Sequence, residues 1–303
     1  MSTSMPTVPF YIADSFTQTR YAGNPAGVVF PEAPLTEAQM LAVAGELHLE
    51  SAFVTPHAGP EADYLVAYYT GAQRIPLCGH DTIALATVLA QSGRLAAPAT
   101  VRLATDVGIL MVEIGEDGTV TMSQALPQYG QILDARDAAG ALGIPLSEIE
   151  ATRLPVQVVS TGTPFVIVPV AHRATLSALM PDMTALVTYG DTLTEAIAGF
   201  YVWTAETEGE DALIHARCFC PAVGLPEDPV TGTASAAAGA YLASHGQLSP
   251  DENGVLSFRT EQGHAMGRPG SAAVRLETDG GRVTRVQISG RAILVGEGML
   301  YWS

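Results

Sequence analysis

The sequence predicts an α+β fold with two pseudo-symmetric domains, each a curved, barrel-like mixed β-sheet around a central buried helix. Three observations support this prediction. A loop that enters an apolar helix occurs twice, at 76–91 and at 229–244. Short strand patterns fill most of the remaining chain. The length of 303 residues is enough for two hydrophobic cores.

A shift of 153 residues aligns the two loop-helix segments without a gap. Seven of the twenty positions from 76 to 95 are identical to their counterparts, and the shift is close to half the chain length. We therefore interpret the pattern as an internal duplication. Two copies are too few for a solenoid, so we expect two similar domains whose helix starts point into one cleft.

Each helix start is a candidate anion site. The second one follows Glu227, Asp228 and Pro229, and its turn contains Gly232. The first N–H groups of a helix have no partner within the helix, and the helix dipole adds about half a positive charge there. A small anionic group can therefore bind at such a position.

The first half of the chain has the pattern of several strands and two helices. Thr36 is the expected N-cap of a helix that ends near His48, because Leu41, Ala44 and Leu47 recur at helical spacing. The helix at 82–91 is apolar on every side and should be buried. Strands are expected at 8–13, 26–30, 50–55, 64–69, 101–103, 109–114 and 120–123.

The second half retraces the first. A polar helix at 134–143, with the segment 145–154, is expected to form a crossover between the domains. Short helical segments are expected at 175–179 and 192–199, before the loop at 227–234 and the second buried helix. Strands are expected at 156–160, 165–170, 200–204, 213–219, 256–260, 272–277, 283–289 and 292–295. The resulting domains are 1–125, completed by a strand at about 295–303, and 126–294.

Composition excludes several classes of protein. The formal charge is −17, whereas nucleic-acid binding needs clustered positive charge, and an anionic membrane surface is disfavoured for the same reason. All 14 basic residues are arginine, so a lysine Schiff base and a P-loop lysine are excluded. Three cysteines make no disulfide framework. No signal-peptide or membrane-span pattern is present, so we expect a soluble, cytoplasmic protein.

Glu50, His80 and Asp228 are the candidate catalytic residues. Removing a proton from carbon requires a positioned base and a group that holds the growing negative charge. The two helix starts can meet the second requirement, and these side chains are candidates for the first. Each has a plainer interpretation: Glu50 as a solvated junction residue, His80 as a structural histidine and Asp228 as a helix cap. Cys78 has two interpretations, a nucleophile beside the helix dipole or a small buried thiol, and we favour the second.

Ordered motifs along the chain carry a resemblance to a known family. They are Asp14-Ser15-Phe16 with Gly23-Asn24-Pro25, Glu50-Ser51-Ala52-Phe53-Val54, Cys78-Gly79-His80, Arg217-x-Phe219 and Glu227-Asp228-Pro229-Val230-Thr231-Gly232. With these motifs the sequence resembles the PhzF family of phenazine biosynthesis isomerases over essentially its whole length.

The resemblance implies a diaminopimelate-epimerase-like fold, a homodimer, no metal and no organic cofactor, with the site in the cleft between the domains. It implies that Glu50 moves a proton on a small carboxylate such as trans-2,3-dihydro-3-hydroxyanthranilate. His80 and Asp228 would hold the substrate. The implied site-lining positions are Gly79, Gly162 and Gly232. Asp81 and Thr233, which directly follow His80 and Gly232, are further candidate binding positions.

The chain departs from the family pattern at Asp81, where we expect a small residue, and at Thr233, where serine is common. If it pointed into the cleft, Asp81 would repel a substrate carboxylate and favour an amino group. Our leading hypothesis is a cofactor-independent isomerase of a small carboxylated carbon acid. The alternatives are an amino-acid racemase or epimerase that uses Glu50 and Asp228, and a non-catalytic protein that binds a small molecule.

Overall fold

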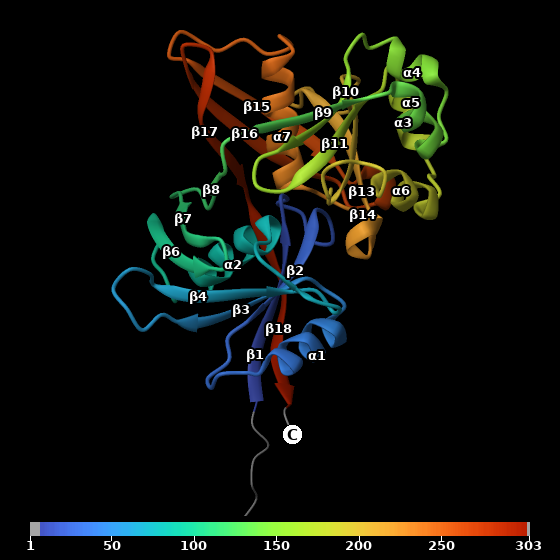
Figure 1. Cartoon of the computed structure of the whole chain (residues 1–303). Helices are drawn as coiled ribbons and strands as arrows, with labels where there is room; N and C mark the ends of the chain where they lie inside the picture. Colours follow the sequence, from blue (N-terminus) through green and yellow to red (C-terminus); the bar gives the residue numbers. More distant parts are fainter. Residues whose placement is uncertain (1–6, 302–303) are drawn as a thin grey trace, which may run out of the picture. The chain divides into compact units, whose positions relative to one another are not determined.

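The computed structural model describes residues 7–301 and divides into two compact units (Figure 1). Unit 1 runs to Met122 and resumes at Ser289, and unit 2 is Ser123–Ile288. Two residues of the strand expected at about 295–303 lie outside the described part. Both units combine mixed β-sheet with few helices, so the predicted α+β class is confirmed.

Unit 1 contains nine strands and two helices within the described residues. The strands pair in the order β18-β1-β2-β3-β4-β6-β7-β8, and β5 pairs on β4. The strands are β1 (Thr7–Ser15), β2 (Asn24–Val29), β3 (Ser51–Pro56), β4 (Tyr64–Tyr69), β5 (Arg74–Ile75), β6 (Ala99–Thr105), β7 (Gly108–Ile114), β8 (Val120–Gln124, which runs into unit 2) and β18 (Ala292–Tyr301). The helices are α1 (Glu37–Leu47) and α2 (Gly79–Gln91).

Unit 2 pairs its strands in the order β9-β10-β11-β12-β13-β15-β16, with β14 on β13. The strands are β9 (Gln128–Leu133), β10 (Val156–Ser160), β11 (Pro164–Pro169), β12 (Gly199–Thr204), β13 (Ile214–Cys220), β14 (Leu225–Asp228), β15 (Val255–Gln262), β16 (Gly270–Asp279) and β17 (Arg282–Gly290, which runs into unit 1). The helices are α3 (Ala135–Leu142), α4 (Leu146–Glu150), α5 (Arg173–Ala178), α6 (Met183–Gly190) and α7 (Gly232–Ser244), with short 3-10 turns η1 (Pro221–Val223) and η2 (His264–Met266).

The two units repeat one order of strand pairings. In unit 1, β1–β2 is antiparallel, β2–β3 parallel, β3–β4 antiparallel and β4–β6 parallel. In unit 2, β10–β11, β11–β12, β12–β13 and β13–β15 follow the same alternation. In the chain, α2 lies between β4 and β6, and α7 lies between β13 and β15. These are the two helices that the sequence repeat aligned.

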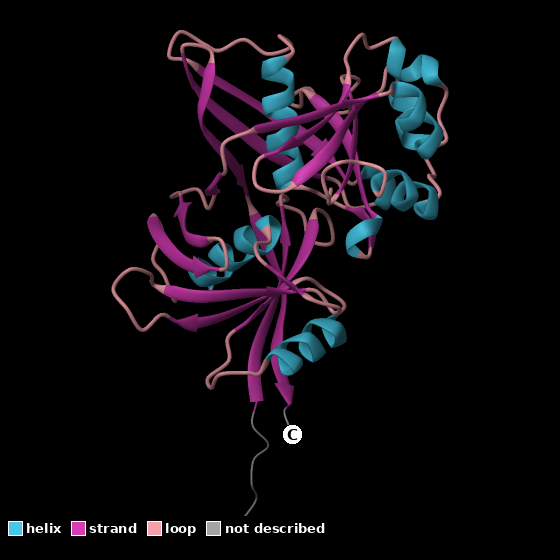
Figure 2. Ribbon diagram, in the orientation of Figure 1, coloured by secondary structure: helices cyan, strands magenta, loops and turns pink. Residues whose placement is uncertain are grey.

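Helices α2 and α7 are buried because their side chains are apolar or small on every side. In α2 every residue from His80 to Leu89 is buried, and in α7 every residue from Ala234 to Leu242 is buried. Helix α2 packs on β1, β2, β3, β7 and β18, and α7 packs on β10, β11 and β16. Figure 2 shows each helix among the strands of its own unit. The start of each helix is therefore fixed by the surrounding sheet.

The opposite sheet faces are covered by the other helices. In unit 1, Val43 and Ala44 of α1 pack with Phe53 and Tyr69. The Gln39 side chain accepts a hydrogen bond of 2.7 Å from the Thr36 N–H, a capping box that starts α1 where the sequence predicted. In unit 2, α3 to α6 cover a second core. That core contains Leu142, Ile149, Val158, Val166, Leu176, Leu186 and Val202.

Three local predictions were wrong, and not every strand was expected. The segment 192–199 is not helical; the helix in this region is α6. Residues 227 and 228 belong to strand β14 instead of a loop, and β9 was not predicted. Helices α3 and α4 pack on the core of unit 2 instead of forming a crossover between domains. These segments are short, and long-range contacts decide their conformation.

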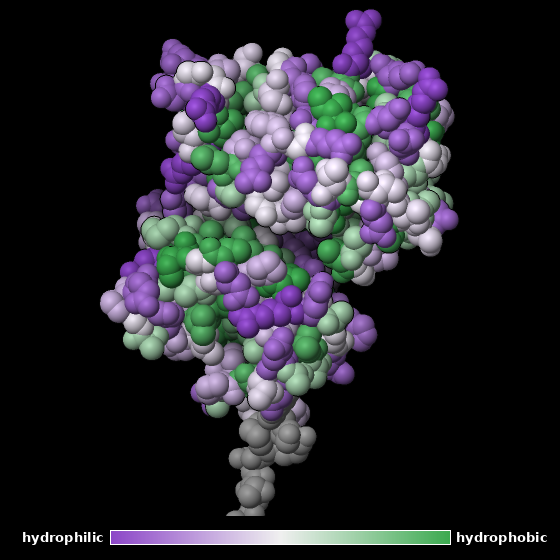
Figure 3. Space-filling model, in the orientation of Figure 1, coloured by the Kyte–Doolittle hydropathy of each residue, from purple (hydrophilic) through white to green (hydrophobic). Residues whose placement is uncertain are grey.

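Within residues 7–301 no helix has both the length and the apolar composition that a membrane span requires. On the face that Figure 3 shows, hydrophilic side chains are interspersed with apolar ones in both units.

Candidate active site

Glu50 lies at the junction of α1 and β3. Helix α1 ends when His48 adopts the left-handed conformation with φ of 54°, which turns the chain toward β3. The Glu50 carbonyl accepts a hydrogen bond of 2.8 Å from the Gly27 N–H. The backbone of Glu50 is therefore tied to β2, while its side chain remains 26% exposed.

The first turn of α2 presents three chemically active side chains. Cys78 is the N-cap residue, and His80 and Asp81 belong to the first turn. The Ser15 hydroxyl donates to the His80 carbonyl at 2.7 Å, and the Thr82 hydroxyl donates to the Cys78 carbonyl at 2.7 Å. Both bonds are buried, so the backbone that carries the three side chains is held in place.

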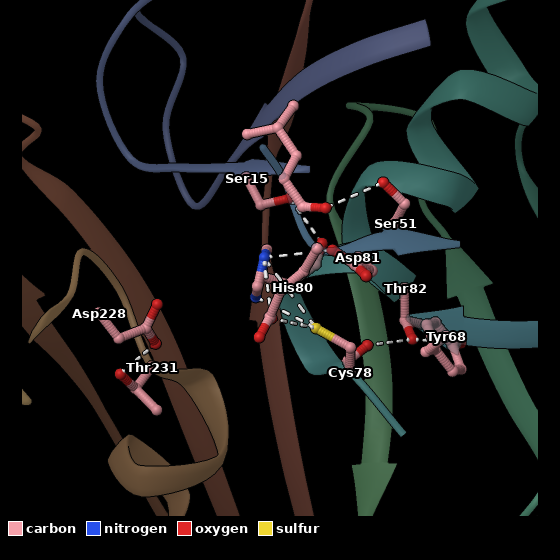
Figure 4. A network of polar contacts seen from close by, with 11 residues as sticks. Ser15, Ser51, Tyr68, Cys78, His80, Asp81, Thr82, Asp228 and Thr231 are labelled. Atoms are coloured by element: carbon pink, nitrogen blue, oxygen red, sulfur yellow. Dashed lines mark hydrogen bonds and ion pairs between the residues drawn. The ribbon is translucent and has the colours of Figure 1, made fainter. Parts of the chain in front are cut away.

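These side chains form one cluster with Glu50, which we call the Glu50 cluster: Glu50, Cys78, His80 and Asp81. Figure 4 shows Cys78, His80 and Asp81 at the start of α2. Cys78 Sγ lies 3.2 Å from Glu50 Oε2 and 3.3 Å from His80 Nδ1. His80 Nε2 lies 3.6 Å from Glu50 Oε2 and 3.1 Å from Asp81 Oδ1. The Asp81 side chain is fully buried, so in this structure its carboxylate contacts His80 and not solvent.

Burial raises the pKa of the Cys78 thiol well above its usual range, and the nearby Asp81 and Glu50 carboxylates raise it further. The thiol is therefore neutral near pH 7 and donates a hydrogen bond to the Glu50 carboxylate. A neutral buried thiol is a poor nucleophile. Cys78 is buried, in agreement with its interpretation from the sequence as a small buried thiol.

The Glu50 cluster also has the composition of a metal site. One ligand atom from each of its four residues lies within 4.8 Å of every other. Thiolate, imidazole and carboxylate together suit zinc and other first-row transition metals.

In unit 2, Asp228 lies at the end of β14, just before α7. The Thr231 hydroxyl donates to Asp228 Oδ2 at 2.5 Å (Figure 4). The Gln262 side chain donates to the Asp228 carbonyl at 2.7 Å and accepts from the Thr231 N–H at 3.1 Å. The Asp228 carboxylate is thus held by the N-cap residue of α7, its backbone carbonyl is held by Gln262 of β15, and the residue is buried.

A largely buried ion pair fixes strand β14. The Arg217 guanidinium binds both oxygens of Glu227, with Nε–Oε1 at 2.9 Å and Nη2–Oε2 at 2.8 Å. Arg217 Nη1 also donates to the carbonyls of Leu176 and Leu179. Because Glu227 immediately precedes Asp228, this bidentate pair holds the backbone next to the candidate residue.

The start of α7 repeats one feature of the start of α2. At equivalent positions of the sequence repeat, Thr82 donates to the Cys78 carbonyl and Ser235 donates to the Thr231 carbonyl, at 2.7 and 3.0 Å. Each hydroxyl also contacts a buried tyrosine hydroxyl: Tyr68 lies 2.7 Å from Thr82, and Tyr201 lies 3.1 Å from Ser235. The duplication therefore preserves how both helix starts are anchored.

The remaining predicted binding positions lie near these helix starts. Gly79 and Gly232 are the first residues of α2 and α7. The Thr161 hydroxyl donates to the Thr233 carbonyl at 3.3 Å. Gly162, the next residue, has a φ of +127°, a conformation that only glycine adopts without strain.

Comparison with known proteins identifies the family of this chain. It matches the family model for phenazine biosynthesis-like proteins over residues 13–298.

The chain belongs to the PhzF family.

Related proteins agree with this assignment. An uncharacterized isomerase of Clostridium acetobutylicum is 35% identical, over 94% of this chain and 95% of that protein. The trans-2,3-dihydro-3-hydroxyanthranilate isomerase of Pseudomonas fluorescens is 29% identical, over 96% and 98%. A crystal structure of a Bacillus anthracis PhzF-family protein has a TM-score of 0.89 and 29% identity, with 98% of this chain and all of that chain covered. The predicted fold and the prediction of an isomerase are confirmed at the level of the PhzF family.

Within this PhzF-family structure, the residues predicted from sequence fall into two groups. Glu50 and His80 meet in unit 1, and Asp228 lies in unit 2. Sequence reasoning missed the contact between Cys78 and Glu50, although Cys78 lies two residues before His80. It also missed Gln262, for which the sequence offers no local signal because it lies on β15, 34 residues from Asp228.

Proposed function

We propose that the protein is a cofactor-independent isomerase that moves a proton on a small carboxylated carbon acid, of the trans-2,3-dihydro-3-hydroxyanthranilate isomerase type. The main observation behind the proposal is the exposure of the Glu50 side chain together with its contacts. Its carboxylate is partly exposed, lies beside the start of α2 and contacts the Cys78 thiol and His80. A carboxylate held in this way can meet a substrate and exchange a proton with it.

The proposed reaction uses Glu50 as both base and acid. Its carboxylate takes a proton from one carbon of the substrate, and the resulting carboxylic acid returns a proton to another carbon. The double bond shifts between these steps, with no net change in atoms or electrons. The positive end of the α2 dipole stabilises negative charge that develops nearby. Proton transfer of this kind needs no organic cofactor.

His80 is proposed to hold the substrate, with Asp81 as a positioning residue. The buried Asp81 carboxylate contacts His80 Nε2, and the Cys78 thiol contacts Nδ1. These two contacts fix the plane of the ring. Asp81 therefore acts through His80 in this proposal and does not bind the substrate directly.

In unit 2 the proposal assigns substrate binding to Asp228, whose placement by Thr231 and Gln262 supports a defined role. It retains the first-turn and loop positions as binding positions: Gly79, Gly162, Gly232 and Thr233. The homodimer that the PhzF resemblance implies remains a prediction.

The test is hydrogen exchange in D2O, followed by NMR. Purified protein would meet dihydrohydroxyanthranilate-like acids and a set of amino acids, beside the variants Glu50→Gln and Glu46→Gln. Glu46 is exposed on α1, four residues away, and its substitution makes the same change of charge. We expect deuterium to enter one substrate carbon with the wild type and Glu46→Gln. We expect turnover by Glu50→Gln to fall by at least about 100-fold.

Each other outcome has a defined meaning. Turnover by Glu50→Gln close to that of the wild type would remove Glu50 from the mechanism. Inversion of a stereocentre instead of a shifted double bond would favour the racemase alternative. Tight binding of an acid without any exchange of its C–H hydrogens would favour the non-catalytic alternative.

A further inference from the structure

Asp81, where the resemblance led us to expect a small residue, completes a set of four different metal-ligating side chains. The Glu50 cluster draws its donors from two segments, with Glu50 from the α1–β3 junction and Cys78, His80 and Asp81 from the start of α2. The set includes one sulfur, one nitrogen and two carboxylates. This combination indicates a transition-metal site, because thiolate and imidazole select transition metals over Mg²⁺ and Ca²⁺. A group of carboxylates alone would not make that distinction.

The donor separations suit four-coordinate zinc. Bond lengths of about 2.0–2.3 Å place neighbouring donors of a tetrahedral site about 3.3–3.5 Å apart. Here Cys78 Sγ lies 3.2 Å from Glu50 Oε2, and His80 Nε2 lies 3.6 Å from that same oxygen and 3.1 Å from Asp81 Oδ1. Cys78 Sγ and His80 Nε2 are 4.0 Å apart, so a small rotation of one side chain would bring both to an ion. Nε2 is the ring nitrogen that both carboxylates contact.

The backbone around these donors is already fixed by buried or main-chain hydrogen bonds. Ser15 holds the His80 carbonyl, Thr82 holds the Cys78 carbonyl, and Gly27 holds the Glu50 carbonyl. Binding therefore requires little ordering of the chain. The side chain of Glu50 is partly exposed and offers a route from solvent to the three buried donors.

We propose that Zn²⁺ binds to Glu50 Oε2, Cys78 Sγ, His80 Nε2 and Asp81 Oδ1, and that this binding inhibits the protein. The Cys78 thiol ligates as a thiolate and releases its proton to solvent when the ion binds. Four protein ligands leave no open position, as in zinc sites that do not perform catalysis. Zinc would also occupy the carboxylate that exchanges protons. The inhibitory effect rests on the proposed function, whereas the binding itself does not.

The experiment uses Co²⁺ as a spectroscopic probe for Zn²⁺, added to the full chain after treatment with EDTA and removal of the chelator. We expect one equivalent of Co²⁺ to produce a thiolate-to-cobalt band in the near ultraviolet and the intense visible bands of four-coordinate cobalt. One equivalent of Zn²⁺ should abolish these bands. The variants are Cys78→Ser, which should lose the thiolate band, and Asp81→Ala, which should bind at least about tenfold more weakly.

Controls separate this site from other donors. Cys218 and Cys220 Sγ lie 3.6 Å apart in unit 2, so Cys218→Ser must leave the cobalt bands unchanged. Circular dichroism verifies folding of each variant, and Asp81→Asn replaces Asp81→Ala if the latter does not fold. A further measurement on the wild type is protection of Cys78 by Zn²⁺ against N-ethylmaleimide, read by mass spectrometry.

The outcomes distinguish the two proposals. Absence of a thiolate band, its loss in Cys218→Ser, or equal affinity in the Asp81 variants would overturn the zinc site. A cobalt site in a protein without turnover on any acid would leave the zinc site standing and weaken the proposed function. Turnover that Zn²⁺ does not inhibit, in a protein that binds cobalt through Cys78, would overturn the inhibitory role alone.

Discussion

The Sγ atom of Cys78 lies 3.2 Å from Glu50 Oε2, although 28 residues separate the two in the chain. This contact joins the start of α2 to the junction of α1 and β3. Because Cys78 also contacts His80, one thiol touches both the proposed base and the proposed binding histidine. In the proposed mechanism the thiol therefore positions both side chains, and its removal should affect turnover.

Replacing Cys78 by alanine should lower kcat, because the Glu50 carboxylate loses the neighbour that fixes its orientation. Misplacing a reacting group by about 1 Å can cost about 100-fold in rate, so the expected loss is up to about 100-fold. Cys78→Ser retains a donor and should stay closer to the wild type. Steady-state kinetics on the substrate found by exchange would measure this difference. Equal kcat for the wild type and the alanine variant would show that the contact has no role in turnover.

Alkylation of Cys78 should be slow and should depend on Asp81. The thiolate is the reactive form, and burial together with the Asp81 and Glu50 charges holds the pKa of Cys78 well above its usual range. Asp81→Asn removes one negative charge, lowers this pKa and should speed alkylation by iodoacetamide at pH 8 in the presence of EDTA. Mass spectrometry of the Cys78 peptide gives the rate. Glu46→Gln, which changes an exposed charge on α1, should not alter it.

Arg217→Ala should destabilise unit 2 strongly. The substitution leaves the Glu227 carboxylate without its bidentate partner and frees the carbonyls of Leu176 and Leu179. Removing one partner of a buried pair costs about 3–5 kcal/mol in the free energy of unfolding. Urea unfolding would measure this cost.

The matched control for that experiment is the exposed pair of Arg102 and Asp63, with a separation of 2.8 Å. Arg102→Ala should cost only about 0–1 kcal/mol, because solvent screens the exposed pair. Similar losses for the two variants would contradict the structural role of Arg217.

Acid should destabilise the protein partly through His215. Burial is the main cause that lowers the pKa of His215, and the nearby His264 lowers this pKa further. The hydrogen bond to Glu261 and the negative charges of Glu261 and Glu208 raise the pKa, but they do not outweigh burial. The folded state therefore binds fewer protons than the unfolded state, whose histidine has a pKa of about 6.5. The contribution to stability is present above about pH 6.5 and is lost as the pH falls below it.

His215→Gln removes this titration, so the melting temperature of the variant should fall less steeply than that of the wild type between about pH 6.5 and pH 5. His48→Gln, at an exposed position on unit 1, should retain the wild-type slope. Identical slopes for the wild type and the His215 variant would exclude His215 as the source.

Gly162→Ala should destabilise the protein through its backbone alone. A Cβ atom at this position would meet Ala125 Cβ at 3.9 Å, an ordinary contact, but the φ of +127° is strained for alanine. The expected cost is about 1–3 kcal/mol. Gly140→Ala, in helix α3 with open space around it, should instead be neutral or stabilising by up to about 1 kcal/mol. Thermal unfolding of both variants would test the contrast.

Local patterns in the sequence determined much of the fold. The capping box at Thr36 and Gln39 starts α1 where predicted, and the all-apolar segments became the buried helices α2 and α7. The repeat at a shift of 153 residues anticipated the matching order of strand pairings in the two units. The helix starts and the buried helices depend on residues close in the chain, so periodicity and turn chemistry are sufficient to predict them. The repeat is recognised by comparing the two halves of the sequence with each other.

The tertiary structure decided what the candidate side chains touch. It joined Cys78 to Glu50, Arg217 to Glu227 and Gln262 to Asp228 through pairings between strands and helices that no local pattern specifies. It also buried Asp81 against His80. The sequence identified Glu50 and His80 as candidates, but packing of β1, β2 and β3 around α2 set their distance, because side chains far apart in sequence meet only when the sheet closes on its helix.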